Sequence, residues 1–120
     1  MIIIGGGPAG YTAALYAARA GFDTLVLERL SAGGQMALTH LIDNYPGFEE
    51  GVDGFTLADK MKKQAERFGA KSKTAEVVRL DLTAEPKRIE TASETFLSRT
   101  VVLATGANPR ELGVEKESEL

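Results

Sequence analysis

The sequence predicts an α/β fold in which a central parallel sheet is joined to an antiparallel β-meander. A β-branched strand at residues 1–4 runs directly into a glycine-rich turn and then an alanine-rich helix. Further helical and apolar strand segments alternate after it, which is typical of a doubly wound sheet with right-handed crossovers. From Glu76 the pattern changes to short strands separated by turns, which is typical of a meander.

The turn after the first strand has the spacing Gly5-x-Gly7-x-x-Gly10. Gly5 permits a tight turn, Gly7 lets a pyrophosphate approach the backbone, and Gly10 lets the following helix pack closely on the sheet. Pro8 suits a first helical turn, where its missing N–H costs nothing, and the helix N-terminus offers N–H groups to phosphates. The motif therefore predicts a dinucleotide site, with a glycine-rich loop that binds no ligand as the alternative.

A second strand at residues 24–27 ends at Glu28. In the sequence, Glu28 follows the glycine motif by close to the spacing of about 20 residues at which a ribose-binding acid is expected. It can accept hydrogen bonds from both adenosine ribose hydroxyls and would repel a 2′-phosphate. FAD or NAD is therefore favoured over NADP at this site, although the neighbouring Arg29 weakens that discrimination.

Two helices are predicted, at residues 8–20 and from a cap at Asp53 or Thr56 to Phe68. The second has apolar residues at the helical period on one face. We interpret its opposite, charged face as solvated. That face comprises Lys60, Lys62, Lys63, Glu66 and Arg67.

The connection over residues 30–51 is long for a compact domain and is expected to carry function, with one helical turn near residues 35–38. His40, the only histidine, lies in this loop. A metal or catalytic role would need partners that a lone histidine lacks, so we expect it to contribute to loop packing and predict no metal site and no catalytic residue.

The remaining elements are strands. A short strand at residues 70–73 completes the β-α-β-loop-α-β order, and the apolar run at 100–104 is expected to be a parallel strand buried on both faces. The meander strands between them are predicted at residues 76–82, 88–92 and 95–98.

Composition excludes several function classes. The net charge of −3 and the pI near 5.2 argue against a nucleic-acid-binding surface. No stretch approaches the roughly 18 apolar residues that cross a membrane. The absence of cysteine removes disulfides, thiolate metal sites and cysteine nucleophiles, and it fits a reducing compartment, so a cytoplasmic location is expected.

Four motifs occur in order along the whole chain, and they resemble those of the low-molecular-weight thioredoxin reductases of bacteria and archaea. The GGQ and NYPG elements are specific to this branch of flavoproteins, which also includes peroxiredoxin-reducing flavoproteins and related ferredoxin–NADP reductases. The motifs are Gly5-Gly6-Gly7-Pro8-Ala9-Gly10-Tyr11-Thr12-Ala13-Ala14, Gly33-Gly34-Gln35-Met36, Asp43-Asn44-Tyr45-Pro46-Gly47-Phe48 and Ala104-Thr105-Gly106-Ala107.

The resemblance implies a Rossmann-like FAD-binding fold. Residues 1–107 would form the N-terminal part of a split FAD-binding domain, and 108–120 a linker toward an NADPH domain that this chain does not contain. In the parent enzyme a hydride passes from NADPH through FAD to a disulfide and then to a partner such as thioredoxin. The redox Cys-x-x-Cys belongs to the NADPH domain, and a homodimer is implied for the parent.

The resemblance also assigns residues on the adenosine side of the cofactor. Glu28 would hold the adenosine ribose, and Val77 would offer backbone groups to the adenine. The residues that would face the pyrophosphate are Gly5, Gly7, Pro8 and Ala9.

On the flavin side, Gly34 and Gln35 would lie along the ribityl chain and flavin, and Asn44 would reach the isoalloxazine. Thr105 and Gly106 would bring a strand end close to the cofactor, with a simple strand-ending turn as the alternative. Amides suit a flavin edge because each offers a donor and an acceptor without charge. The alternative for Gln35 and Asn44 is that they cap turns of the loop.

Two other functions remain open from the sequence. One is the NAD-binding module of a dehydrogenase, although the long loop and the meander weigh against it because a simple NAD domain needs neither. The other is a structural fragment with no activity of its own.

Overall fold

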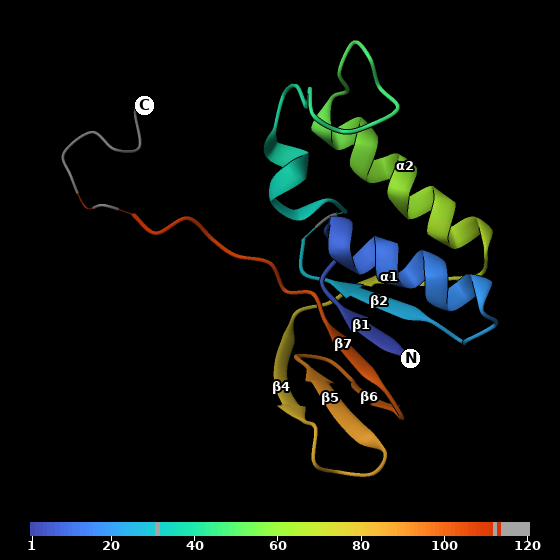
Figure 1. Cartoon of the computed structure of the whole chain (residues 1–120). Helices are drawn as coiled ribbons and strands as arrows, with labels where there is room; N and C mark the ends of the chain where they lie inside the picture. The colour runs from blue at the N-terminus through green and yellow to red at the C-terminus, as the bar shows by residue number, and fades with distance from the viewer. Residues whose placement is uncertain (31, 112, 114–120) are drawn as a thin grey trace.

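The computed structural model describes residues 1–30, 32–111 and 113, and they form three layers (Figure 1). The middle layer is a parallel sheet of order β3-β2-β1-β7. Its strands are β1 (Ile2–Ile4), β2 (Leu25–Glu28), β3 (Lys71–Thr74) and β7 (Val101–Leu103). Helices α1 (Pro8–Arg19) and α2 (Gly54–Arg67) cover one face. The other face is covered by the antiparallel sheet of β4 (Val77–Asp81), β5 (Lys87–Thr91) and β6 (Thr95–Ser98). The predicted fold class is confirmed.

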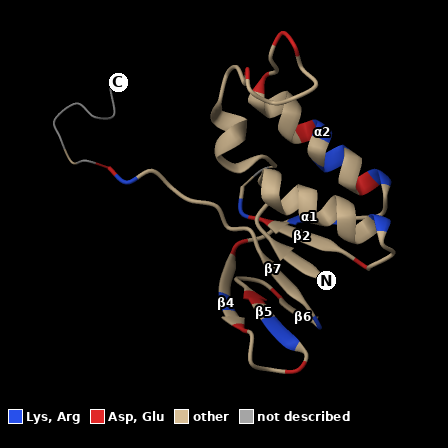
Figure 2. Ribbon diagram, viewed as in Figure 1, with Lys and Arg blue, Asp and Glu red and all other residues tan. Residues whose placement is uncertain are grey.

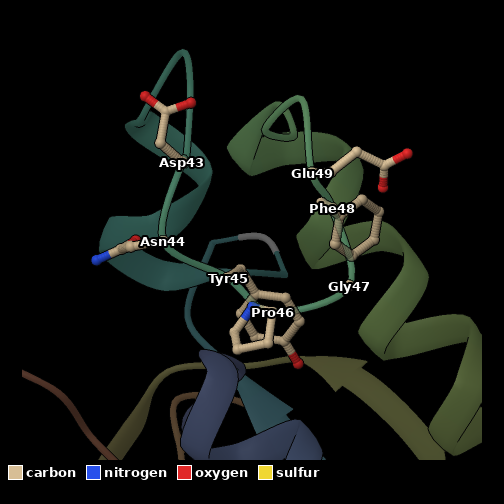
Figure 3. Close-up of a pocket in the computed structure, with 7 residues that line it drawn as sticks. All are labelled: Asp43, Asn44, Tyr45, Pro46, Gly47, Phe48 and Glu49. Atoms are coloured by element: carbon tan, nitrogen blue, oxygen red, sulfur yellow. The ribbon is translucent and has the colours of Figure 1, made fainter.

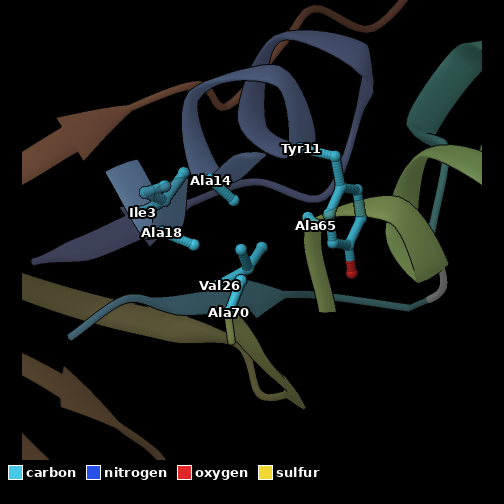
Figure 4. Close-up of a cluster of buried hydrophobic side chains, with 7 residues drawn as sticks. All are labelled: Ile3, Tyr11, Ala14, Ala18, Val26, Ala65 and Ala70. Atoms are coloured by element: carbon cyan, nitrogen blue, oxygen red, sulfur yellow. The ribbon is translucent and has the colours of Figure 1, made fainter. Parts of the chain in front are cut away.

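The alternation of side chains along β1 divides the core into two clusters. Ile3 points to the helices and is completely buried there, whereas Ile2 and Ile4 point to the antiparallel sheet. The cluster on the helical side is shown in Figure 4 and comprises Ile3, Tyr11, Ala14, Ala18, Val26, Ala65 and Ala70. The cluster on the other side comprises Ile2, Ile4, Leu27 and Ile89. The two central strands, β1 and β2, are thus buried on both faces, as their apolar sequences require.

Local signals set the ends of both helices. α1 ends one residue before the predicted boundary, where Gly21 takes a positive φ and donates its N–H to the carbonyl of Ala18. α2 is capped by Asp53, whose carboxylate accepts from the Thr56 backbone N–H at 2.9 Å and from its hydroxyl at 3.1 Å. The backbone hydrogen bond from Thr56 lowers the pKa of Asp53. Asp53 is therefore the cap, of the two candidates that the sequence offered.

The strand predicted at residues 100–104 differs from expectation. β7 spans only Val101–Leu103 and pairs with β1 alone, so it is an edge strand of the described sheet. Val101 and Val102 are half-buried, and Leu103 is 56% exposed. A continuous apolar run indicates that a strand is suited to burial. How many strands pair with it, and how much of it is covered, depends on other parts of the fold.

The long connection contains the predicted helical turn as a 3-10 helix, η1 (Gly34–Leu38). Beyond it, Ile42 and Val52 pair through two backbone hydrogen bonds that close the base of the 43–51 loop. α2 begins directly against η1. Gly54, its first residue, lies so close to the carbonyl of Met36 that a Cβ at this position would collide with it. The loop is thus fixed at both of its ends.

Charged side chains of both signs occur along the ribbon, including α2 (Figure 2). One ion pair joins the middle layer to the antiparallel sheet, where Lys73 Nζ lies 2.6 Å from a carboxylate oxygen of Glu94. Within the described part of the chain, no helix is long and apolar enough to cross a membrane.

We expect Gly10→Ala to destabilise the fold. A Cβ at this position would collide with the carbonyl of Gly5, a backbone atom that cannot move away cheaply. Overpacking of this kind costs roughly 1–3 kcal/mol of unfolding free energy, which thermal denaturation followed by circular dichroism would detect. Gly7→Ala is the matched control, because its Cβ would meet only the carbonyl of Gly33, at 3.9 Å. Equal melting temperatures for Gly10→Ala and the wild type would contradict this packing argument.

Candidate functional site

The predicted phosphate loop joins β1 to α1 and is shaped by close backbone contacts. Gly5 has φ +113°, and a Cβ there would collide with the carbonyl of Ala104 at the end of β7. Gly10 rests directly on Gly5. Gly7 differs from both, because its φ of −80° suits any residue and its Cβ direction is open. The first and third glycines of the motif serve the fold, and the second leaves space in front of the loop.

The N-terminus of α1 faces this space without any capping side chain. Gly7 is the N-cap residue, Pro8 is the first helical residue, and the first turn carries no acidic side chain. The N–H groups of a first helical turn have no partner within the helix, and the helix dipole places partial positive charge there. Pro8 and Ala9 are both exposed at this end. These features fit an anionic group such as a diphosphate.

A cleft of about 240 Å³ lies at the carboxyl ends of the parallel strands. It brings together three predicted site residues from distant parts of the sequence: Gly5 after β1, Val77 at the start of β4, and Thr105 after β7. Gly106 follows with a positive φ. Clefts at this edge of an open parallel sheet are where α/β folds bind nucleotides. The remaining lining residues are Ile4, Leu27, Arg29, Ala75 and Glu76.

Glu28, the predicted ribose acid, is 2% exposed and points toward the helices. Its Oε2 lies 3.0 Å from the Tyr11 hydroxyl, and its Oε1 lies 3.1 Å from the Lys62 ammonium. The Tyr11 hydroxyl is also 3.1 Å from Ser72 Oγ. A hydroxyl has one proton, so Tyr11 donates to Glu28 and accepts from Ser72. Burial, together with the adjacent Glu28 charge, raises the pKa of Tyr11 well above its usual value and keeps it a donor.

The interpretation of Lys62 as part of a solvated face is wrong. Its side chain is 31% exposed and paired with Glu28, whereas Lys63 beside it is 72% exposed and paired with Asp59. Lys62 lies four residues after Ala58 and three before Ala65, and the structure buries both alanines. It therefore lies on the inner side of α2.

Gly6 is a further residue that the sequence reasoning left unassigned. A Cβ there would lie 2.5 Å from Glu28 Oε2 and 2.8 Å from Glu28 Cβ. The Glu28 carboxylate therefore packs directly against the phosphate loop. Gly6 also accepts a hydrogen bond of 2.6 Å from the N–H of Gly33, which caps η1. This middle glycine joins the loop both to the buried carboxylate and to the long connection.

The long connection starts beside the phosphate loop. Gly34 follows the cap, and a Cβ on it would lie 3.6 Å from the Cα of Gly7. This places Gly34 in front of the loop, and its predicted position along the ribityl chain and flavin stays a prediction. Gln35 is the next residue in η1 and is exposed. The structure therefore brings the start of the GGQ motif to the glycine turn.

Asn44 lies in the 43–51 loop and is exposed, with its amide directed away from the Tyr45 and Pro46 rings (Figure 3). This loop surrounds a shallow hollow of about 380 Å³, and the rings of Tyr45 and Phe48 lie 6.0 Å apart in it. Neither Asn44 nor Gln35 makes a side-chain hydrogen bond to another described residue. The two amides thus cap no turn within the described part of the chain, and their reach to a flavin stays a prediction.

His40 is exposed. Among residues 1–30, 32–111 and 113, no group of three or more histidine, cysteine, aspartate or glutamate side chains could hold a metal ion.

Comparison with known proteins gives a consistent result. The family model described as pyridine nucleotide-disulphide oxidoreductase matches residues 1–120. A thioredoxin reductase of Streptomyces coelicolor is 46% identical over all of this chain, which covers 38% of that protein. A bifunctional thioredoxin reductase/thioredoxin of Mycobacterium leprae is 47% identical over all of this chain, which covers 26% of it.

Solved structures agree. The thioredoxin reductase of Lactococcus lactis superposes with a TM-score of 0.89 at 42% identity, covering 98% of this chain and 39% of its own. That of T. acidophilum superposes with a TM-score of 0.88 at 38% identity, covering 98% and 38% respectively. The chain thus spans well under half the length of these relatives. It belongs to the pyridine nucleotide-disulphide oxidoreductase family and corresponds to the N-terminal part of its thioredoxin reductases.

Proposed function

We propose that this chain is the FAD-binding portion of a thioredoxin-reductase-like flavoprotein. The observation that carries the proposal is the uncapped N-terminus of α1 behind Gly7, which opens next to the cleft at the ends of β1, β2 and β7. An extended dinucleotide needs both features, a diphosphate site and an adjoining cleft for its nucleoside. The identity of 46% to a thioredoxin reductase over the whole chain supports the choice of cofactor.

In this proposal the chain binds and orients the cofactor. The diphosphate lies against Gly5, Gly7, Pro8 and Ala9, with the N–H groups of the first helical turn as donors. The adenine enters the cleft beside the backbone of Val77. FAD, when bound, supplies the redox chemistry.

The adenosine ribose is assigned to Glu28. Its two oxygens already accept hydrogen bonds from Tyr11 and Lys62, and the carboxylate is nearly inaccessible. Each carboxylate oxygen has a further acceptor position. A ribose hydroxyl therefore reaches Glu28 only after a local shift of the side chain.

The flavin half is assigned to the start of η1 and to the end of β7. Gly34 and Gln35 follow the contact with the phosphate loop, and Thr105 and Gly106 follow β7 across the cleft. Asn44 approaches from the 43–51 loop, where it has an unused amide.

The activity we propose for the whole protein is the NADPH-dependent reduction of the thioredoxin disulfide. The names of the relatives supply this assignment, and the 120 residues here contain no cysteine that could take part in disulfide exchange. We place the NADPH and disulfide sites outside this chain, residues 108–120 as the connection toward them, and the enzyme as a cytoplasmic homodimer. Of that connection, residues 112 and 114–120 lie outside the described residues.

Cofactor binding tests the proposal directly. The purified protein, freed of endogenous ligand, is titrated with FAD and with NAD⁺ while flavin absorbance and protein fluorescence are followed. We expect saturable FAD binding with a flavin absorption band that remains after gel filtration. Binding of NAD⁺ without flavin would point to a dehydrogenase-type module, and binding of neither would contradict the proposal.

We expect Gly7→Ala to abolish or greatly weaken FAD binding while the fold stays intact. The new methyl group would occupy the open space in front of the phosphate loop, where the diphosphate must approach the backbone. Isothermal titration with FAD, together with a melting curve of the free protein, separates the two effects. An unchanged FAD affinity would show that the diphosphate lies elsewhere.

We expect Glu28→Ala to weaken FAD binding. Removal of the acceptor would leave ribose hydroxyls unpaired within the site, a loss of roughly 1–3 kcal/mol. The substitution should be tolerated by the fold, because Tyr11 keeps Ser72 as a partner and Lys62 has access to water. A flavin titration that gives the wild-type dissociation constant would count against the ribose assignment.

A further inference from the structure

The feature that the proposed function leaves unused is the buried ion pair beneath the phosphate loop. Glu28 contributes the anion from the end of β2, and Lys62 contributes the cation from the middle of α2, with 3.1 Å between Oε1 and Nζ. In the described part of the chain, no other cationic group lies within 4.0 Å of this carboxylate. Among the described residues, Lys62 alone balances the charge of Glu28 at contact distance.

Removing one partner from such a pair is costly. A buried carboxylate without a counter-charge either takes up a proton or moves toward water. Tyr11 would still donate one hydrogen bond to it, but a neutral donor does not cancel a charge. The position of Glu28 therefore depends on Lys62.

Movement of the Glu28 side chain would change the packing of the phosphate loop. Its carboxylate fills the space that a Cβ of Gly6 would need, so the two groups are in contact. α2 also reaches the loop by a second route, because Ala58 packs against Gly33, whose N–H donates to the carbonyl of Gly6. Both routes lead to Gly6, directly before the residue that faces the diphosphate.

We propose that Lys62 is a positioning residue for the cofactor site and acts through Glu28 on the adenosine diphosphate half of FAD. The inference rests on the proposed function and deepens it. Lys62 holds the carboxylate in place, beside Gly6 and at the end of β2. It also cancels a negative charge that would otherwise lie directly behind the loop that receives an anionic diphosphate.

The other cations near this part of the chain do not substitute for Lys62. Lys63 is the next residue of α2, but its ammonium pairs with Asp59 at 2.7 Å on the outer surface, where Asp59 raises the pKa of Lys63. Lys60 and Arg29 are exposed and form no ion pair with a described residue. Lys63 is therefore a matched control, since it is also a lysine ion-paired on the same helix.

The test compares Lys62→Met with Lys63→Met in the full-length protein. Dissociation constants are measured by calorimetry for FAD, for ADP as the adenosine diphosphate half, and for FMN as the flavin half. For Lys62→Met we expect the constants for FAD and ADP to rise by roughly tenfold or more, the scale for a lost charge-assisted hydrogen bond to a buried group, with FMN binding unchanged. Lys63→Met should bind all three ligands like the wild type.

Two further variants separate positioning from a general loosening of the fold. Lys62→Arg keeps the charge and should retain ADP binding. The double variant Glu28→Gln/Lys62→Met removes both charges. It should therefore have a higher melting temperature and bind ADP more tightly than Lys62→Met alone. This comparison holds even if the single variant folds poorly.

Several outcomes would overturn the inference. Wild-type affinity of Lys62→Met for ADP would do so, as would an equal loss of ADP and FMN binding, which indicates loosening of the whole site. A double variant that binds no better than Lys62→Met would show that Lys62 does not act through Glu28. If the wild type binds FAD in these experiments, the proposed function stands whichever way Lys62 behaves. If the wild type binds neither FAD nor ADP, both proposals fail.

Discussion

The contact of Gly10 with the carbonyl of Gly5 is the constraint on which the rest of this structure depends. It allows α1 to begin directly on the turn that leaves β1, with no side chain between helix and strand. The same close approach places the first-turn N–H groups in front of the turn and carries the next residue, Tyr11, down to the sheet. One backbone contact thus positions both the helix N-terminus that we propose binds the diphosphate and the Tyr11 side chain that covers Glu28.

The two faces of the parallel sheet carry different parts of the site. On the helical face, the polar groups of Tyr11, Glu28 and Lys62 lie between the apolar cluster and the carboxyl edge of the sheet. Every buried polar side chain in the described part of the chain is hydrogen-bonded. On the opposite face, the antiparallel sheet covers Ile2 and Ile4 and brings Val77 to the same edge. The cleft is formed where these layers end, so its shape follows from the fold.

Local patterns explain why most of this architecture could be predicted. The spacing of Gly5, Gly7 and Gly10 and the position of Glu28 each depend on a turn and its adjoining strand, and periodicity located both helices. The partners of Glu28 could not be read in this way, because Lys62 is 34 residues distant in sequence and a lysine on an amphipathic helix is ordinarily solvated. The expectation that the strand at residues 100–104 is buried on both faces was also wrong, because apolar composition does not specify how much of a strand its neighbours cover.

The adenosine side and the flavin side of the proposed site are built differently. The adenosine side is made of strand ends, buried glycines and an ion pair, and it is held by interactions across all three layers. On the proposed flavin side, the assigned residues Gly34, Gln35 and Asn44 are exposed, and so are Leu38 at the end of η1 (75%) and Leu41 just after it (56%). Apolar side chains in such positions make a favourable contribution only when something covers them. The proposed adenosine side is therefore held by the three-layer core and needs only a local shift at Glu28 to admit a ribose, whereas the apolar side chains on the proposed flavin side lie open to solvent.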